Sequence, residues 1–290
     1  MATKFSPPGT RPFLKWAGGK FRLISTLSPY LPKTAESILI EPFVGAGAVF
    51  LNTPYSRFIL NDANQDIINL FLLLQKNALE FINEAHKLFQ PKYNQKNMYL
   101  ALRQKFNQST CVLERSVLFL YLNRHGYNGL CRYNQALQFN VPFGQYSAPY
   151  FPQKELTQFS EKAQKAQFSH LDCSLLFKKI IATLEKKTPN AHLIVYCDPP
   201  YVPLNKTARF TQYSGVIFNE AKQIELAEFA KQAAQLGATV IISNHDTAFT
   251  QSLYQSAHIL SFEVKRTISC NALNRVPVKE LLAVFEAKKD

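Results

Sequence analysis

The feature that most constrains the fold is a short apolar segment that ends at a proline and a glycine-rich turn. Residues 37–42 read Ser-Ile-Leu-Ile-Glu-Pro and predict a buried strand, and the turn that follows contains Gly45 and Gly47 before an apolar helix. A second strand, Arg57–Leu60, ends at Asn61 and Asp62. A strand, a glycine turn, a helix and a strand followed by an acidic residue form the opening βαβ unit of a doubly wound parallel sheet.

The rest of the chain divides into a helical stretch and a return to alternating strands and helices. Residues 64–123 have helical periodicity, and the Arg, Tyr, Asn, Gly and Pro residues between Arg124 and Pro152 predict a basic hairpin or loop. From about Phe168 we expect these elements: strands at Leu193–Cys197 and Thr239–Ser243, a helix at Asn219–Leu236 and an edge strand at Val278–Phe285. Because crossovers between parallel strands are short, residues 64–165 are predicted to be an inserted domain. Residues 1–63 and 166–290 then form one discontinuous α/β domain of the Rossmann-like type, with helices on both faces of its sheet.

Charge and cysteine usage limit the classes of partner and site. The chain has 33 Lys and Arg against 20 Asp and Glu, so its net charge is +13. A folded chain with this excess suits a polyanion such as nucleic acid, although a charge that serves only solubility is the alternative. The five cysteines have no C-x-x-C spacing, which argues against a zinc site or a disulfide framework and favours a reducing compartment. The first 12 residues read as an extended arm, and no apolar run approaches the roughly 18 residues of a membrane span. We therefore expect a soluble cytosolic protein.

The segment Asp198-Pro199-Pro200-Tyr201 carries the most chemical information. It follows a buried strand, and its two prolines fix the backbone and remove two N–H donors. The Asp198 carboxylate and the Pro199 carbonyl can each accept one hydrogen of an exocyclic amine, while the Tyr201 ring stacks on the base. The glycine turn can let a ligand approach the backbone, and Asp62 can accept ribose hydroxyls. Taken singly, the turn could merely start a helix, and Asp62 could merely cap one.

Together these motifs resemble those of the S-adenosylmethionine-dependent amino methyltransferases that act on DNA bases. More narrowly, the chain resembles the Dam-type DNA adenine-N6 methyltransferases, in which the cofactor motif precedes the recognition insert and the D-P-P-Y segment follows it. The resemblance covers nearly the whole chain. It is carried by Phe13–Lys20, Glu41–Gly47, Tyr121–Arg132, Asn140–Gly144, Asp198–Tyr201 and Ser243–Thr247.

The resemblance implies a role for each matching residue. The residues expected to bind S-adenosylmethionine, which becomes S-adenosylhomocysteine, are Trp16, Lys20, Phe43, Gly45, Gly47, Asp62, Asp172 and Asp198. Those expected to bind double-stranded DNA are Lys15, Arg124, Tyr127, Asn128, Leu130, Arg132, Pro142 and Tyr146. Among the latter, Arg132 matches the residue that reads a guanine. Two positions depart from the family pattern, because Gln145 stands where a basic residue is common and His125 replaces a frequent tyrosine.

The implied reaction is direct methyl transfer to N6 of an adenine flipped out of a GATC site. No metal is expected, and the enzyme is expected to act as a monomer in a prokaryotic cytoplasm, at the nucleoid, or to be encoded by a phage. Whether Asp198 or water takes the final proton is left open by the sequence.

Methylation of cytosine N4 remains an alternative, although Asp198 before the two prolines favours adenine. Methylation of a protein glutamine would leave the basic insert unexplained, and a DNA-binding regulator without catalysis would leave the intact cofactor motifs unexplained. A cytosine-C5 route fails because none of the five cysteines follows a proline.

Overall fold

The computed structural model describes residues 9–32, 36–186, 191–203, 212–213, 216–264 and 278–288. The first eight residues of the expected extended arm lie outside these ranges, and so does Cys270. The chain divides into two compact units, each described here by itself. The helical unit comprises Met1–Pro29, Val44–Pro54 and Asn64–Phe168, and the sheet unit comprises Tyr30–Phe43, Tyr55–Ala63 and Ser169–Asp290. Unlike the predicted domains, this division assigns the amino-terminal residues and Val44–Pro54 to the same unit as the insert.

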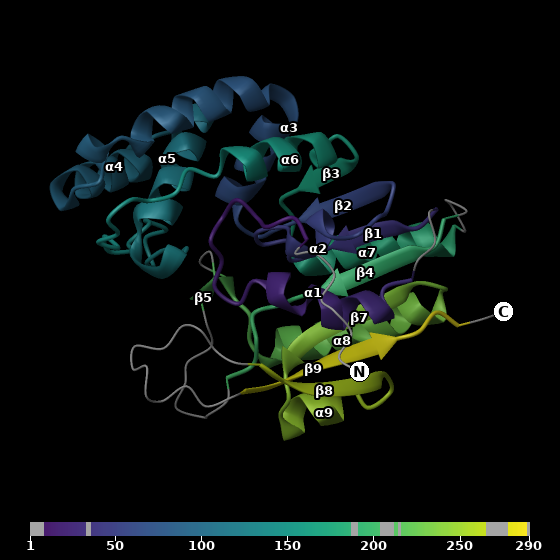
Figure 1. Cartoon of the computed structure of the whole chain (residues 1–290). Coiled ribbons are helices and arrows are strands. Elements are labelled where there is room, and N and C mark those ends of the chain that lie inside the picture. The colour runs from purple at the N-terminus through teal and green to yellow at the C-terminus, as the bar shows by residue number, and fades with distance from the viewer. Residues whose placement is uncertain are drawn as a thin grey trace, which may run out of the picture. The chain divides into compact units, whose positions relative to one another are not determined.

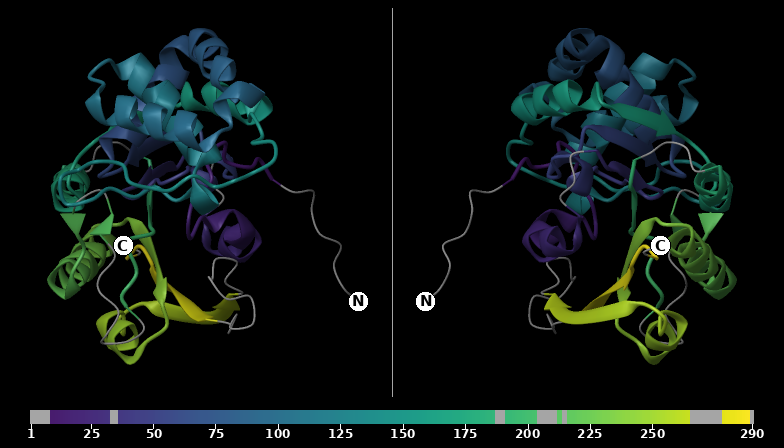
Figure 2. Two further views of the ribbon diagram at one scale, coloured as in Figure 1. Left: turned by 90° about the vertical axis from the view of Figure 1, so that its left-hand side faces the viewer. Right: turned by 90° about the vertical axis from the view of Figure 1, so that its right-hand side faces the viewer.

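The helical unit consists mainly of helices, as Figures 1 and 2 show. Its main helices are α3 (Gln65–His86), α4 (Lys96–Gln108), α5 (Val112–His125) and α6 (Gln153–Ala163). Its shorter helices are η1 (Lys20–Leu23), α1 (Ile24–Leu27), α2 (Ala48–Leu51), η3 (Lys87–Phe89), η4 (Pro91–Tyr93) and η5 (Tyr127–Gly129), while η2 (Ser28–Tyr30) begins here and ends in the sheet unit. Helix α5 is buried along its last ten residues and packs against α3 and α4, so it forms the centre of this unit.

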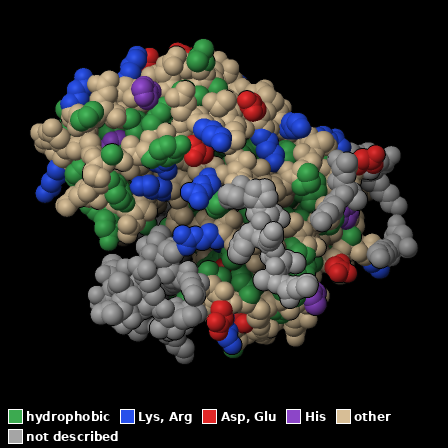
Figure 3. Space-filling view, in the orientation of Figure 1, with side chains coloured by type: hydrophobic (Ala, Val, Ile, Leu, Met, Phe, Trp, Pro, Cys, Tyr) green, Lys and Arg blue, Asp and Glu red, His purple; other side chains and the backbone are tan. Residues whose placement is uncertain are grey.

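A partly buried ion pair fixes the start of α3 against α5. The Arg115 guanidinium donates to both carboxylate oxygens of Asp66, through Nε at 2.5 Å and Nη2 at 3.1 Å. The Tyr133 hydroxyl donates to the same carboxylate at 2.6 Å, so the segment after α5 is tied to this pair. On the face of the helical unit seen in Figure 3, Lys and Arg side chains are spread with few Asp and Glu among them.

The sheet unit is built on a seven-stranded sheet with the order β3-β2-β1-β4-β7-β9-β8. The strands are β1 (Ile38–Glu41), β2 (Arg57–Asn61), β3 (Ala166–Ser169), β4 (Leu193–Cys197), β7 (Thr239–His245), β8 (His258–Val264) and β9 (Val278–Phe285), of which β3 spans the boundary between the units. A separate two-stranded sheet pairs β5 (Gln212–Tyr213) with β6 (Val216–Ile217). β1 pairs in parallel with β2 and β4, β4 pairs in parallel with β7, and β9 is antiparallel to both β7 and β8. The order reverses direction between β1 and β4, which makes that point the topological switch of the sheet.

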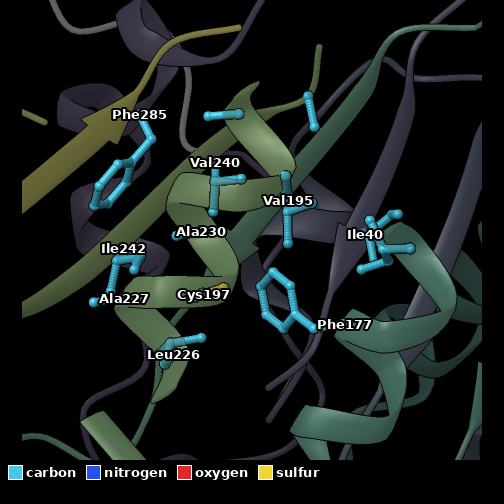
Figure 4. Close-up of a cluster of buried hydrophobic side chains, with 14 of the residues drawn as sticks. Ile40, Phe177, Val195, Cys197, Leu226, Ala227, Ala230, Val240, Ile242 and Phe285 are labelled. Carbon is cyan, nitrogen blue, oxygen red and sulfur yellow. The ribbon is translucent and has the colours of Figure 1, made fainter. Parts of the chain in front are cut away.

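Helices α7 (Cys173–Glu185), α8 (Glu220–Gln235) and α9 (Ala248–Leu253) complete the sheet unit. One face of the sheet is covered by α7 and α8, whose apolar side chains interlock with alternate strand residues (Figure 4). The labelled residues of this core are Ile40, Phe177, Val195, Cys197, Leu226, Ala227, Ala230, Val240, Ile242 and Phe285. Because side chains alternate along a strand, residues between these positions, such as Tyr196 and Ser243, belong to the opposite face.

One expectation about the fold is wrong. The segment Val278–Phe285 is not an edge strand, since β9 lies between β7 and β8 and its last five residues are buried. Polar residues alternate only at the start of this segment, and the edge strand on this side of the sheet is β8. Of the hairpin or loop expected between Arg124 and Pro152, the described residues form a loop without strands, which contains the isolated antiparallel bridges Gly126↔Phe143 and Tyr133↔Phe139. Side chains such as Asn107, which bonds the Phe139 backbone, replace the ladder there.

Candidate functional site

The carboxyl ends of the central strands of the sheet unit bring polar side chains to one edge. Asp198 follows β4 directly, and the polar residues Ser243, Asn244 and His245 form the end of the neighbouring strand β7. This edge flanks the switch point between β1 and β4. In open α/β sheets such an edge is where ligands bind.

Hydrogen bonds from neighbouring elements fix the segment Asp198–Tyr201. Ser243 Oγ donates to Asp198 Oδ1 at 2.9 Å, and Gln223 Nε2 from α8 donates to the Pro200 carbonyl at 2.8 Å. The residue after Tyr201 is also held, because Val202 N donates to Asn244 Oδ1 at 3.1 Å and its carbonyl accepts from His245 Nδ1 at 2.7 Å. Within the described residues, no donor is bound to the Pro199 carbonyl. The scaffold therefore bonds one of the two proline carbonyls, that of Pro200.

The Tyr201 ring is held at its hydroxyl and at its edge. The hydroxyl donates to Glu280 Oε2 on β9 at 3.1 Å, and the ring meets the His245 ring edge-on with centroids 4.8 Å apart. Burial raises the pKa of Tyr201 well above its usual value, and the Asp198 and Glu280 carboxylates raise it further. Tyr201 is therefore a neutral hydrogen-bond donor with a fixed ring, which suits stacking on a base.

The other predicted cofactor residues of the sheet unit lie in three places. Phe43 follows β1 and packs edge-on against Phe218, with ring centroids 5.5 Å apart. Asp62 follows β2 and is buried, and its N–H donates to the carbonyl of Ser169 at 3.3 Å. Asp172 caps the start of α7, where its Oδ1 accepts from Ser174 N at 2.9 Å. A structural role for Asp172 is thus established, whereas its contact with a cofactor stays a prediction.

The helical unit contains the remaining predicted cofactor residues, Trp16, Lys20, Gly45 and Gly47. Gly45 and Gly47 have φ angles of 49° and 74°, which favour glycine. A Cβ atom on Gly45 would lie 2.8 Å from Trp16 Nε1, so this glycine is also needed for the close approach of the indole. Lys20 is buried, not a solvated surface charge, and its Nζ donates to the Gly18 carbonyl at 2.8 Å.

Several predicted DNA-binding residues cluster in the helical unit. The Lys15 backbone forms two hydrogen bonds of 2.8 Å with the Asn123 side-chain amide, one in each direction. Lys15 Nζ lies 4.0 Å from the centre of the Tyr146 ring, and the Tyr146 hydroxyl accepts from Asn128 N at 2.9 Å. Burial, and the nearby Arg124 cation, lower the pKa of Lys15. The structure thus brings together Lys15, Asn128 and Tyr146, which lie far apart in the sequence.

A tight turn over Gly126–Leu130 presents the neighbouring predicted residues. Tyr127 N donates to the Pro142 carbonyl at 2.9 Å, which joins the turn to the second half of the segment. Asn128 has a left-handed φ of 52°, and a Cβ on Gly129 would lie 2.2 Å from the Lys15 Cβ. The side chains of Tyr127, Asn128 and Pro142 are exposed, and that of Leu130 is half-buried.

The two predicted arginines differ in their surroundings. Arg132 is exposed, and its guanidinium donates to the Asn140 side chain at 2.8 Å and to the Asn140 carbonyl at 3.3 Å. Arg124 is buried, its Nε donates to the Tyr150 carbonyl at 3.0 Å, and burial lowers its pKa. Arg132 is placed at the surface as a base-reading residue must be, whereas Arg124 holds the segment together.

Sequence reasoning missed the residues that hold the site. The resemblance includes Ser243, Asn244 and His245 in one of its motifs but implies no role for them. Three polar residues at the end of an apolar strand were the available signal. Gln223 and Glu280 gave no signal, because each contacts the site only through the fold.

Two features, a metal site and a membrane span, are absent from the described part of the chain. Among the described residues there is no group of three or more His, Cys, Asp or Glu side chains that could hold a metal ion. The helices that the structure describes include none with an apolar stretch long enough to cross a bilayer.

Comparison with known proteins identifies the family. Residues 16–268 match the family model of the D12 class N6 adenine-specific DNA methyltransferases. The chain is 47% identical over 276 residues to a DNA adenine methylase of Vibrio cholerae, covering 95% of this chain and 96% of that protein. It is 46% identical to the DNA adenine methylase of Escherichia coli K12, with 95% of each chain covered. A solved rRNA methyltransferase of Streptomyces viridochromogenes, aviRa, aligns with 97% of this chain and 88% of its own at 13% identity, and its TM-score of 0.38 supports no argument. The chain, with its Rossmann-like sheet, therefore belongs to the D12 class of N6 adenine-specific DNA methyltransferases.

Proposed function

We propose that the enzyme methylates N6 of an adenine flipped out of double-stranded DNA, within the sequence GATC. The observation that carries this proposal is the fixed Asp198–Tyr201 segment at the switch-point edge. Gln223 bonds the Pro200 carbonyl and Ser243 bonds Asp198 Oδ1, and in this proposal the Asp198 carboxylate and the Pro199 carbonyl accept the two amino hydrogens of adenine. Accepting both hydrogens favours a pyramidal nitrogen whose lone pair points outward, and it stabilises the positive charge that develops on N6 during transfer.

The family implies S-adenosylmethionine as the methyl donor, and the residues present fit it. That cofactor supplies a sulfonium methyl group, which leaves with the S–C electron pair remaining on sulfur. In this proposal the Trp16 indole and the Gly45–Gly47 turn provide an apolar wall, Lys20 neutralises a carboxylate, and Asp62 accepts ribose hydroxyls. The clash that a Cβ on Gly45 would make with Trp16 supports this use of the turn. Phe43 and Asp172 are assigned to the same cofactor, and no metal ion takes part.

Sequence recognition is proposed for the cluster in the helical unit. Arg132 reads a guanine through two hydrogen bonds in the major groove. Lys15 and Tyr146 contact the outer guanine. Two further pairs complete the proposal: Leu130 and Pro142 contact a thymine methyl, while Tyr127 and Asn128 enter the stack that the adenine leaves. Arg124 contributes mainly by holding this segment in place.

The enzyme is proposed to act as a monomer on duplex DNA in the cytoplasm, at the nucleoid of a bacterium or in a cell infected by a phage that encodes it. The DNA substrate and the bacterial relatives support this location.

The deciding experiment incubates the enzyme with plasmid DNA and methyl-labelled cofactor. The product is then digested with one nuclease that is blocked by GATC methylation and one that requires it. We expect label in N6-methyladenine, together with protection from the first nuclease and cleavage by the second. Label in N4-methylcytosine would replace the proposal by the alternative base. Label in adenine without a change in cleavage would reject the GATC site but not the methylation of adenine.

A further inference from the structure

The hydroxyl of Ser243 lies at the meeting point of two strands and the proposed catalytic carboxylate. Ser243 is 1% exposed, and its Oγ lies 2.9 Å from Asp198 Oδ1, 3.2 Å from the Tyr196 hydroxyl and 3.3 Å from the Cys197 carbonyl. Tyr196 is on β4 and Ser243 on β7, which pair in parallel. The proposed function gives no role to either side chain.

Strand alternation places these groups on the side of the sheet opposite α8. Val240 and Ile242 of β7, and Cys197 of β4, point into the core against α8 (Figure 4). Ser243 and Tyr196 are the next residues along these strands, so they project from the other face. The hydrogen bond between Tyr196 and Ser243 therefore joins the adjacent parallel strands β4 and β7 close to Asp198.

The number of hydrogens that each group can donate determines the direction of these hydrogen bonds. A serine hydroxyl has one hydrogen to donate, and a carboxylate attracts it more strongly than a neutral carbonyl. The Ser243 hydrogen therefore goes to Asp198. Burial raises the pKa of Tyr196 well above its usual value, so its phenol stays protonated and donates to Ser243 Oγ. The result is a directed chain from the Tyr196 hydroxyl through the Ser243 hydroxyl to Asp198 Oδ1.

We propose that Ser243 is a positioning residue that orients the Asp198 carboxylate toward the adenine amino group, and that Tyr196 acts behind it by orienting the Ser243 hydroxyl. With Oδ1 held by the scaffold, the plane of the carboxylate is set before the base arrives. Such preorganisation accelerates the chemical step more than it strengthens binding. This inference rests on the proposed role of Asp198.

The test compares single-turnover methyl transfer by four variants of the full chain: Ser243→Ala, Ser243→Thr, Tyr196→Phe and the double variant S243A/Y196F. For S243A we expect the transfer rate to fall about 10- to 100-fold, the loss typical of a misplaced reacting group, while the Kd values for DNA and cofactor change less than about threefold. S243T, which keeps the hydroxyl, should recover most of the rate. For Y196F we expect a loss of about two- to tenfold, the effect of one ordinary hydrogen bond.

The double variant provides the sharpest outcome. If Tyr196 acts only through Ser243, S243A/Y196F is no slower than S243A, because the two losses do not add. Losses that multiply would overturn the chain from Tyr196 through Ser243. An S243A rate within twofold of the parent would overturn the positioning role.

Two matched controls separate positioning from loss of stability. Thr239→Val removes a buried hydroxyl from the amino end of the same strand, where it bonds His192 at 2.9 Å. Tyr55→Phe removes a buried phenol hydroxyl that bonds the Pro32 carbonyl at 2.6 Å. Both controls should keep the parent rate, and thermal unfolding should show losses comparable with those of S243A and Y196F. A rate loss in T239V as large as in S243A would assign the effect to stability and overturn the inference.

Asp198→Ala is assayed alongside, because an active D198A rejects the proposed function, whereas an inactive D198A with an active S243A rejects this inference alone.

Discussion

The two units differ in how they use charge. The helical unit carries 17 Lys and Arg against 6 Asp and Glu, a net charge of +11, whereas the sheet unit carries 16 against 14, a net charge of +2. Almost all of the basic excess therefore belongs to the unit that contains the proposed DNA-reading residues. Because phosphates attract cations without regard to sequence, this charge can bring DNA to the enzyme but cannot choose a base.

The polar groups of the sheet unit have a different arrangement. They gather at the carboxyl edge of the sheet, where Ser243, Asn244, Gln223 and Glu280 bond the Asp198–Val202 segment. In the helical unit, by contrast, polar bonds such as those of Asn123 to Lys15 pin backbone segments that carry exposed side chains. The sheet unit therefore holds one short segment, the proposed reacting site, in a fixed geometry, while the helical unit presents a surface.

The largest effect is expected for Asp198→Ala in the sheet unit. Removing the acceptor for the N6 hydrogen should lower the methyl-transfer rate by about 10³-fold or more, since it removes charge stabilisation and orientation together. DNA affinity, measured by fluorescence anisotropy, should remain within about threefold of the parent because the basic surface belongs to the helical unit. A loss of DNA binding equal to the loss of rate would contradict the separation of roles.

The next largest effect is expected for Asp66→Ala in the helical unit, and it concerns stability. The change leaves the partly buried Arg115 guanidinium without its bidentate partner, which should lower the free energy of unfolding by about 2 kcal/mol. Urea unfolding measures this value. Glu84→Ala is the matched control, since its pair with Lys87 is exposed and should contribute less than about 1 kcal/mol. Equal losses of unfolding free energy in the two variants would show that the Asp66–Arg115 pair stabilises the unit no more than an exposed pair does.

A smaller and more selective effect is expected for Arg132→Ala. Losing a bidentate contact to guanine should reduce discrimination at one base pair by about 1–3 kcal/mol, with a weaker effect on binding to unrelated DNA. Methylation rates on oligonucleotides substituted at each position of the site measure the change. Arg57→Ala, an exposed arginine of the sheet unit, should leave the site preference unaltered. If both variants shift the preference alike, recognition does not belong to the helical unit.

The smallest effect concerns pH and His125. Burial lowers the pKa of His125 from 6.5 to about 4, so the folded protein holds this ring neutral while the unfolded chain protonates it below about pH 6.5. The contribution of His125 to stability is therefore complete above pH 6.5 and is lost as the pH falls toward 4. Between pH 7 and 5.5 the loss should be about 1 kcal/mol.

His125→Tyr, which introduces the residue frequent in the family, removes this titration. Urea midpoints of the parent and H125Y at both pH values test the assignment. The gap between the two proteins should shift in favour of H125Y as the pH falls, and parallel pH curves would show that another group is responsible.

Much of the sheet unit could be predicted because its signals are local. An apolar run followed by glycine or proline predicted β1 with its turn and β4 with the segment that begins at Asp198, and the structure confirms both strands. The error at β9 has the same origin. Alternation over Val278–Leu281 describes local exposure, whereas the place of a strand in a sheet depends on which distant strands pair with it.

In the helical unit, too, contacts between residues distant in sequence could not be predicted. Helical periodicity over residues 64–123 predicted a helical region correctly, and α3, α4 and α5 lie there. The turn residues after Arg124 indicated a surface segment, but the few bridges and side-chain bonds that replace a regular hairpin depend on Asn107 and Tyr133, whose partners are distant in sequence.

The family, the order of the motifs and the role proposed for Asp198 could all be inferred from the sequence, because residue types at fixed short spacings carry that information. Which groups hold Asp198 in place became visible in the folded chain alone. Ser243, Gln223 and Glu280 lie 45, 23 and 79 residues from the partners that they bond. Strand register and helix packing set these contacts, and neither can be read from the neighbouring residues alone.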